Sequence, residues 1–77
     1  MSVQIRYFAS FRERMGRASD IIDDTTVTSV TQVWARVSGN RPLPVNTLVA
    51  VNMQYADLDR TVQDGDEVAF FPPVTGG

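Results

Sequence analysis

The side chains of this 77-residue chain offer little reactive chemistry, which directs attention to its C-terminal carboxylate. The sequence contains no cysteine and no histidine, which excludes thiolate nucleophiles, thiolate metal sites and the commonest general base. All seven basic residues are arginine, so no lysine amine can form a Schiff base or accept an isopeptide bond. The sequence ends in Gly76-Gly77, and a carboxylate on Gly77 can be activated for attack by a nucleophile.

The residues around this carboxylate predict a projecting tail. Two prolines remove backbone donors and end a β-like run, so the chain should leave the sheet at residue 72. Two terminal glycines keep the end thin enough to thread a narrow channel in another protein, although a frayed terminus is the simpler alternative. We expect the last four residues to be disordered in the free protein and to become ordered on binding. The predicted flexible tail consists of Pro72, Pro73, Val74, Thr75, Gly76 and Gly77.

Composition predicts a single small domain spanning residues 1–77. Hydrophobic residues make up 43% of the chain and charged residues 21%, which is ordinary for a soluble globular domain. The net charge of −2 provides no electrostatic surface for nucleic acid or anionic membranes. No run approaches the roughly 20 apolar residues of a membrane span, and the N-terminus lacks a signal pattern, so a cytoplasmic location is expected.

Periodicity predicts several short strands. The first run alternates, with Val3, Ile5 and Tyr7 on one face and polar residues on the other. Turn signals, including Gly16 as a left-handed cap, separate the runs. The predicted strands are residues 2–8, 17–22, 48–52, 55–58 and 67–71, with a short helix or turn at residues 9–15.

One longer helix is predicted from Thr26 onward. Its apolar residues recur at spacings of three and four, as on one face of a helix. Thr26 can cap this helix, and Ser29, with Gln32 three residues later, offers a competing start. Gly39-Asn40 should end it. The core is expected to include Ile5, Val30, Trp34, Val37 and Val68.

This order of elements predicts an α+β domain with one main helix packed across a mixed sheet. If the first and last long strands lie side by side in the centre, the fold is a β-grasp, the ubiquitin-like architecture. Periodicity does not determine that pairing.

Alternation also predicts a surface for a partner. Phe8 falls on the polar side of the first strand, and Phe71 faces away from Val68 and Phe70 in the last strand. Neighbouring aromatic residues on the face away from the helix would form an apolar patch. Phe71, Phe8 and Tyr55 are therefore the candidate partner-binding residues, with burial under loops as the alternative.

Four aspartates near the end of the chain could suggest a metal loop. Their spacing lacks the distal glutamate of an EF-hand, so we interpret them as turn formers and predict no metal site. These residues are Asp57, Asp59, Asp64 and Asp66.

The segment from Asp64 to Gly77, DGDEVAFFPPVTGG, resembles the C-terminus of the small, sulfur-carrier subunit of molybdopterin synthase. Arg6-Tyr7-Phe8-Ala9 and the helix preceded by Thr26-Val27 lie where that family has similar elements, so the resemblance covers the whole chain. Its specific part is the fourteen-residue tail segment. The absence of lysine and a short loop at residues 40–47 are minor departures from the family's pattern, and neither affects the tail.

The resemblance implies that Gly77 carries sulfur. A partner activating enzyme of the E1-like kind would use ATP to adenylate the glycine carboxylate, and a sulfur donor protein would convert it to a thiocarboxylate. The thiocarboxylate would enter the large synthase subunit and donate its sulfur to a cyclic pterin precursor, with two carriers used for each dithiolene. The chain itself would bind no cofactor and act as a non-catalytic subunit.

Three other functions remain open at this stage. The sulfur carrier of thiazole synthesis shares the fold and the Gly-Gly end, although Phe71-Pro72-Pro73 argues against it by resemblance. A ubiquitin-like modifier would pass Gly77 to lysines of target proteins. A plain interaction module would tolerate the loss of Gly76-Gly77.

Overall fold

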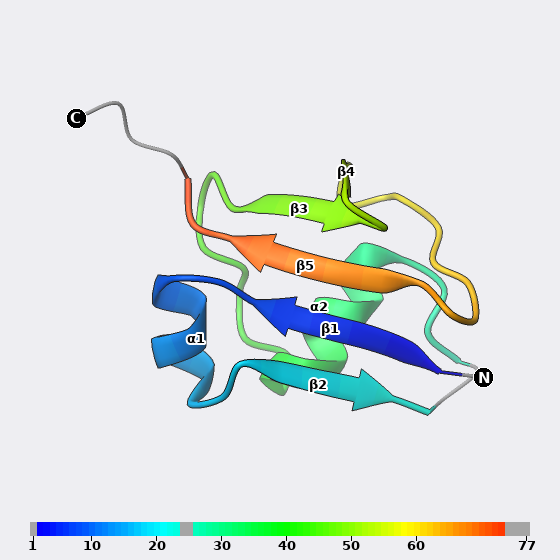
Figure 1. The fold of residues 1–77 in the computed structure, drawn as a ribbon, viewed down its shortest axis with the longest axis horizontal. Coiled ribbons are helices and arrows are strands. Elements are labelled where there is room, and N and C mark those ends of the chain that lie inside the picture. Colours follow the sequence, from blue (N-terminus) through cyan, green and yellow to red (C-terminus); the bar gives the residue numbers. More distant parts are fainter. Residues whose placement is uncertain (1, 24–25, 74–77) are drawn as a thin grey trace.

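The computed structural model describes residues 2–23 and 26–73, which form one five-stranded mixed sheet with two helices (Figure 1). The strands lie in the order β2-β1-β5-β3-β4. Along the chain the elements are β1 (Val3–Tyr7), α1 (Ser10–Met15), β2 (Ser19–Ile22), α2 (Val30–Ser38), β3 (Leu48–Val51), β4 (Gln54–Tyr55) and β5 (Glu67–Phe71).

The first and last strands lie side by side, which is the pairing that periodicity left undetermined. β1 runs parallel to β5, with Ile5 opposite Val68 and Tyr7 opposite Phe70. β2 and β3 flank this pair in antiparallel register. The prediction of a β-grasp fold is therefore confirmed.

The core lies between the sheet and α2, which covers one face of the sheet (Figure 1). Trp34 of α2 packs edge-on against Phe70 and Phe11, with ring centroids 5.2 and 5.7 Å away. Its indole nitrogen donates a hydrogen bond to the carbonyl of Arg41. Of the predicted core residues, only Val37 is partly rather than fully buried.

The short helix α1 begins from a strained turn. The amide of Phe11 donates to the carbonyl of Phe8, and Ala9 between them has φ 52° and ψ −124°, as in a type II′ turn. Gly16 ends the helix in the left-handed conformation, as predicted. The turn and α1 together connect β1 to β2, which pairs with β1 in antiparallel register.

The predicted start of α2 at Thr26 is wrong, and the competing start is correct. Ser29 is the N-cap, and its hydroxyl accepts a hydrogen bond from the amide of Gln32. The residues on either side of Ser29 pair with the segment that follows β4, because the amide of Val62 donates to the carbonyl of Thr28 and the amide of Val30 donates to the carbonyl of Arg60. This pairing keeps the segment extended. Gly39 ends the helix in the left-handed conformation, as predicted.

The predicted strand at residues 55–58 is also wrong in extent. β4 comprises only Gln54 and Tyr55, after which the chain turns toward the start of α2. The carbonyl of Leu58 accepts hydrogen bonds from the amide and the hydroxyl of Thr31. These bonds to α2 replace those of a longer edge strand.

Candidate functional site

The face of the sheet opposite α2 carries a shallow hollow of about 470 Å³, which we call the outer hollow. It lies over β1, β5, β3 and the β3–β4 turn, on the face that α2 leaves uncovered in Figure 1. The residues that line it are Arg6, Phe8, Ala50, Met53, Tyr55, Glu67 and Phe71.

The small side chain of Ala50 lines this hollow between larger ones. Ala50 and Ala69 are direct cross-strand partners, and Tyr55 on β4 is opposite Ala50. Each alanine is only 6% exposed. The short side chain of Ala50 leaves a depression between the larger residues that line the hollow.

Two stacked aromatic rings form one end of the hollow. Phe8 and Phe71 lie with ring centroids 4.7 Å apart and planes 11° from parallel, and both are half-buried. The prediction that alternation turns both rings to the face away from the helix is confirmed. β1 and β5 are parallel neighbours, which brings the C-terminal ends of both strands, and hence the two rings, together.

The remaining wall is formed by exposed side chains of the β3–β4 hairpin. Tyr55 is 76% exposed and Met53 is 91% exposed. The structure thus brings Tyr55 to the same hollow as the two phenylalanines, while the role of all three in binding stays a prediction. The sequence analysis missed Met53, because a single apolar residue in a turn has no periodic signal.

An ion pair closes the hollow on the side away from the phenylalanines. The guanidinium of Arg6 lies 3.6 Å from the carboxylate of Glu67, and both side chains are partly exposed. Such a pair in high dielectric contributes little to stability, but it places one charge of each sign at the rim.

The chain leaves the sheet next to the stacked rings. β5 ends at Phe71, Pro72 is half-buried and Pro73 is exposed, which confirms that the prolines end the strand. The predicted tail residues Val74, Thr75, Gly76 and Gly77, including the candidate sulfur-carrying carboxylate, lie outside the described residues. The described geometry therefore sets only the point of departure of the tail.

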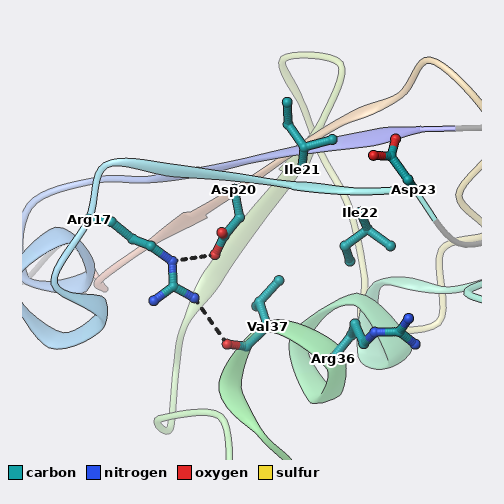
Figure 2. Close-up of a pocket in the computed structure, with 7 residues that line it drawn as sticks. All are labelled: Arg17, Asp20, Ile21, Ile22, Asp23, Arg36 and Val37. Carbon is teal, nitrogen blue, oxygen red and sulfur yellow. Dashed lines mark hydrogen bonds and ion pairs between the residues drawn. The ribbon is translucent and has the colours of Figure 1, made fainter.

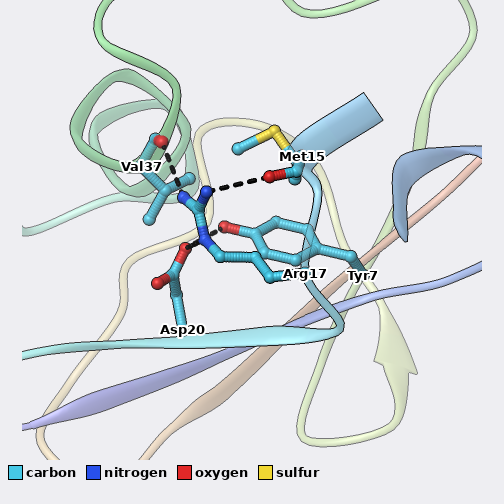
Figure 3. A network of polar contacts seen from close by, with 5 residues as sticks. All are labelled: Tyr7, Met15, Arg17, Asp20 and Val37. Atoms are coloured by element: carbon cyan, nitrogen blue, oxygen red, sulfur yellow. Dashed lines mark hydrogen bonds and ion pairs between the residues drawn. The ribbon is translucent and has the colours of Figure 1, made fainter. Parts of the chain in front are cut away.

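A second hollow, of about 560 Å³, lies between β2 and the end of α2 (Figure 2). Arg17 dominates it. Its guanidinium binds the carboxylate of Asp20 and donates to the carbonyl groups of Met15 and Val37, at the ends of α1 and α2 (Figure 3). Because this arginine joins β2 to both helices, we interpret the cluster as structural.

Tyr7 also belongs to this polar cluster, through contacts with Asp20 and Arg17. Its hydroxyl donates to Asp20 at 2.8 Å, and the guanidinium of Arg17 lies 5.7 Å from the ring centroid. Burial raises the pKa of Tyr7 well above its ordinary value, and the hydrogen bond to Asp20 raises it further. The phenol therefore stays protonated at neutral pH and acts as a donor rather than a base.

The predicted turn at Asp64 and Asp66 is confirmed, because the backbone amide of Asp66 donates to the carbonyl of Gln63 and the Asp66 carboxylate accepts from the amide of Gln63. The Asp66 carboxylate also accepts from the side chain of Asn52, and the Asp64 carboxylate accepts from the distant amide of Ser2. Residues 2–23 and 26–73 contain no group of three or more acidic side chains able to hold a metal ion. None of the helices in this part of the chain is long and apolar enough to cross a membrane.

Comparisons with known proteins agree with this geometry. The model of the ThiS family matches residues 5–77. The molybdopterin synthase sulfur carrier subunit of Escherichia coli K12 is 40% identical, over 97% of this chain and 99% of the relative. The crystal structure of SAMP1 from Haloferax volcanii superposes with a TM-score of 0.83 and 26% identity, covering 100% of both chains. A chain in a Helicobacter pylori complex of subunits 1 and 2 of molybdopterin-converting factor shares the fold, with a TM-score of 0.68, 22% identity and 100% coverage of both chains.

Proposed function

The chain belongs to the ThiS family, and from this premise we propose that it is the sulfur-carrier subunit of a molybdopterin synthase. The observation that carries the proposal is the 40% identity, along nearly the whole length of both chains, to a protein of that name. The C-terminal DGDEVAFFPPVTGG segment supports it, because that tail supplies the group on which the chemistry depends.

The proposed chemistry takes place at the carboxylate of Gly77. A free carboxylate is a poor electrophile, so an E1-like activating enzyme first joins it to AMP from ATP, with release of pyrophosphate. Sulfur at the sulfide level, supplied by a sulfur donor protein, then attacks the acyl carbon, displaces AMP and leaves a thiocarboxylate. Within the large synthase subunit, the sulfur of this group attacks the cyclic pterin precursor. Water then cleaves the acyl–sulfur bond, which leaves the sulfur on the pterin and restores the carboxylate of Gly77.

The chain's own contribution to this chemistry is position. Four residues follow Pro73, and an extended chain covers at most about 3.6 Å per residue, so Gly77 lies within about 14 Å of Pro73. A protein that holds the carboxylate must therefore cover the neighbouring surface. We propose that the large subunit docks on the outer hollow, with Phe8, Phe71 and Tyr55 as apolar contacts. ATP and the pterin bind to the partners, and this chain supplies no cofactor site.

The alternatives differ in the destination of Gly77. A thiazole carrier would load sulfur but would not serve a molybdopterin synthase large subunit. A protein modifier would appear in isopeptide bonds to target lysines. An interaction module would retain its function without the last two glycines.

The decisive experiment is sulfur loading followed by transfer. Incubation with the activating enzyme, ATP and a sulfur donor should give the mass gain of one oxygen replaced by sulfur, located at Gly77 alone. A reconstituted synthase should then form the pterin dithiolene. Deletion of Gly77 withdraws the carboxylate by one residue, about 3.5 Å, more than near-attack geometry tolerates, and should abolish product.

Two controls test whether this loss is chemical rather than structural. The thermal unfolding midpoint of the deletion variant should be nearly unchanged, since this residue follows the strand-ending prolines. A variant with one residue added after Gly77 should be equally inactive, because its glycine carbonyl then lies within an ordinary peptide bond. Full sulfur transfer by either variant would refute the carrier function.

A further inference from the structure

The turn between β3 and β4 contains a residue whose side chain the fold does not require. Val51 pairs with Gln54, so Asn52 and Met53 form a two-residue hairpin loop. Their φ angles are 51° and 68°, which is the type I′ pattern with both central residues left-handed. Asparagine suits the first position, whereas the second strongly favours glycine, because a side chain there is strained.

The same residue is also exposed. Met53 is 91% exposed, more than any other large hydrophobic side chain in the described ranges 2–23 and 26–73. Burial within the protein therefore does not offset its strained backbone. A residue that combines a strained backbone with an exposed apolar side chain is a candidate for binding another molecule.

The turn is held in place by Asn52. Its backbone amide donates to the carbonyl of Glu67, and its side-chain oxygen accepts from the amide of Glu67. Its side-chain nitrogen donates to the carboxylate of Asp66. These three bonds attach the loop to the start of β5 without any contribution from the side chain of Met53. Glycine at position 53 should therefore preserve the hairpin and relieve its strain.

The side chain of Met53 lines the outer hollow, together with Tyr55 and the stacked phenylalanines. The chain leaves the sheet at Phe71, at the aromatic end of this hollow, so a protein that holds the Gly77 carboxylate lies close to this surface and can extend along it to the hairpin. Methionine is flexible and polarisable, so it adapts to an irregular apolar partner. Long-lived subunit interfaces are more apolar than transient ones, which favours the synthase subunit over the activating enzyme as the partner.

We propose that Met53 is a binding residue for the large synthase subunit, kept at a strained and exposed position because it becomes buried in that interface. This inference rests on the proposed function. It extends the interface from the aromatic end of the hollow to the hairpin tip, and it implies that stability and binding respond in opposite directions to substitution at this position.

The test is Met53→Gly in the full chain. The thermal unfolding midpoint should rise by about 3 °C or more, because the left-handed strain is relieved. The dissociation constant for the large subunit, measured by titration calorimetry, should increase about tenfold, as for other interface anchors. Met53→Leu retains an apolar side chain and should stay within about threefold of the wild type.

Two matched control variants test whether relief of strain, or loss of any exposed apolar side chain, is enough to weaken binding. Asn46→Gly relieves a similar left-handed residue, with φ 64°, outside the hollow. It should leave the dissociation constant unchanged. Val45→Ala removes an 81% exposed apolar side chain outside the hollow and should also leave binding unchanged.

Wild-type affinity of Met53→Gly for the large subunit would overturn the inference, as would a lowered unfolding midpoint, which would show that Met53 supports the fold. A defect confined to adenylation would overturn it too, by assigning the residue to the activating enzyme. If the wild-type protein fails to bind the large subunit, the proposed function fails along with the inference. If the wild type binds and Met53→Gly binds equally well, only the inference fails.

Discussion

Phe70 and Phe71 are adjacent on β5 and have opposite environments. Phe70 is 0% exposed and its ring lies within 5.2 to 6.4 Å of the rings of Trp34, Phe11 and Tyr7. Phe71 is half-buried on the uncovered face, where it stacks on Phe8. The same residue type thus serves the core on one face of the sheet and an exposed aromatic pair on the other.

The difference between the two faces arises from strand alternation and the position of α2. Every strand residue faces either the helix or solvent, and α2 covers only one side (Figure 1). The covered face contains closely packed aliphatic and aromatic residues, whose loss should unfold the domain. The uncovered face contains an apolar pair that the fold does not need to bury, so its loss should affect binding instead.

The largest effect is expected at the covered face. Phe70→Ala should lower the free energy of unfolding by about 3 to 5 kcal/mol, because it leaves a cavity among three rings. A domain of this size has only about 5 to 10 kcal/mol in total, so the milder Phe70→Leu should be measured alongside by urea denaturation. Equal stability of both variants and the wild type would contradict the assignment of Phe70 to the core.

The next effect tests the uncovered face. Phe71→Ala should weaken binding to the large subunit by about 1 to 2 kcal/mol and change the free energy of unfolding by less than about 1.5 kcal/mol. Titration calorimetry measures the first quantity and urea denaturation the second. Ile21→Ala, which removes a 64% exposed side chain of β2 outside the hollow, is the control. An unchanged dissociation constant for Phe71→Ala would place Phe71 outside the interface.

A smaller effect is expected from the polar edge of the covered face at alkaline pH. Because the folded-state pKa of Tyr7 is raised, the unfolded chain loses its proton first, and stability falls as pH rises above about 10. The sequence contains no lysine and no cysteine, the other side chains whose ordinary pKa values lie near this range.

The loss of stability should reach about 1 kcal/mol near pH 11, measured by urea unfolding at a series of pH values. Tyr7→Phe should remove most of this pH dependence. Tyr55→Phe, at the exposed tyrosine, should leave it intact. An equal alkaline loss in Tyr7→Phe and the wild type would show that Tyr7 is not the group responsible.

The smallest effect is expected from the ion pair on the uncovered face. Arg6→Gln should change the free energy of unfolding by less than about 0.5 kcal/mol, since Arg6 is 57% and Glu67 33% exposed in their side chains. Thermal denaturation at low and high salt measures this. A loss above about 1 kcal/mol would show that the uncovered face contributes to stability more than its exposure indicates.

Much of this fold follows from local patterns in the sequence. Alternation places Phe8 and Phe71 on the face away from Val68, and it does so without knowledge of the neighbouring strands, because successive side chains on a strand point to opposite sides. Gly16 and Gly39 end the two helices for the same local reason, since each must adopt a left-handed conformation. The Gly-Gly end and the absence of cysteine, histidine and lysine are likewise properties of the sequence alone.

The tertiary structure decided which of these elements meet. The parallel pairing of β1 with β5 joins residues from opposite ends of the chain, and it brings Phe8 onto Phe71. Backbone pairing with residues 60–62 moved the helix start from Thr26 to Ser29, against the apolar spacing that extends back to Val27. The place of Met53 beside the hollow depends on a hairpin register and a left-handed turn. Each of these is a contact between distant segments or a backbone conformation, and the spacing of apolar residues along the chain carries no information about either.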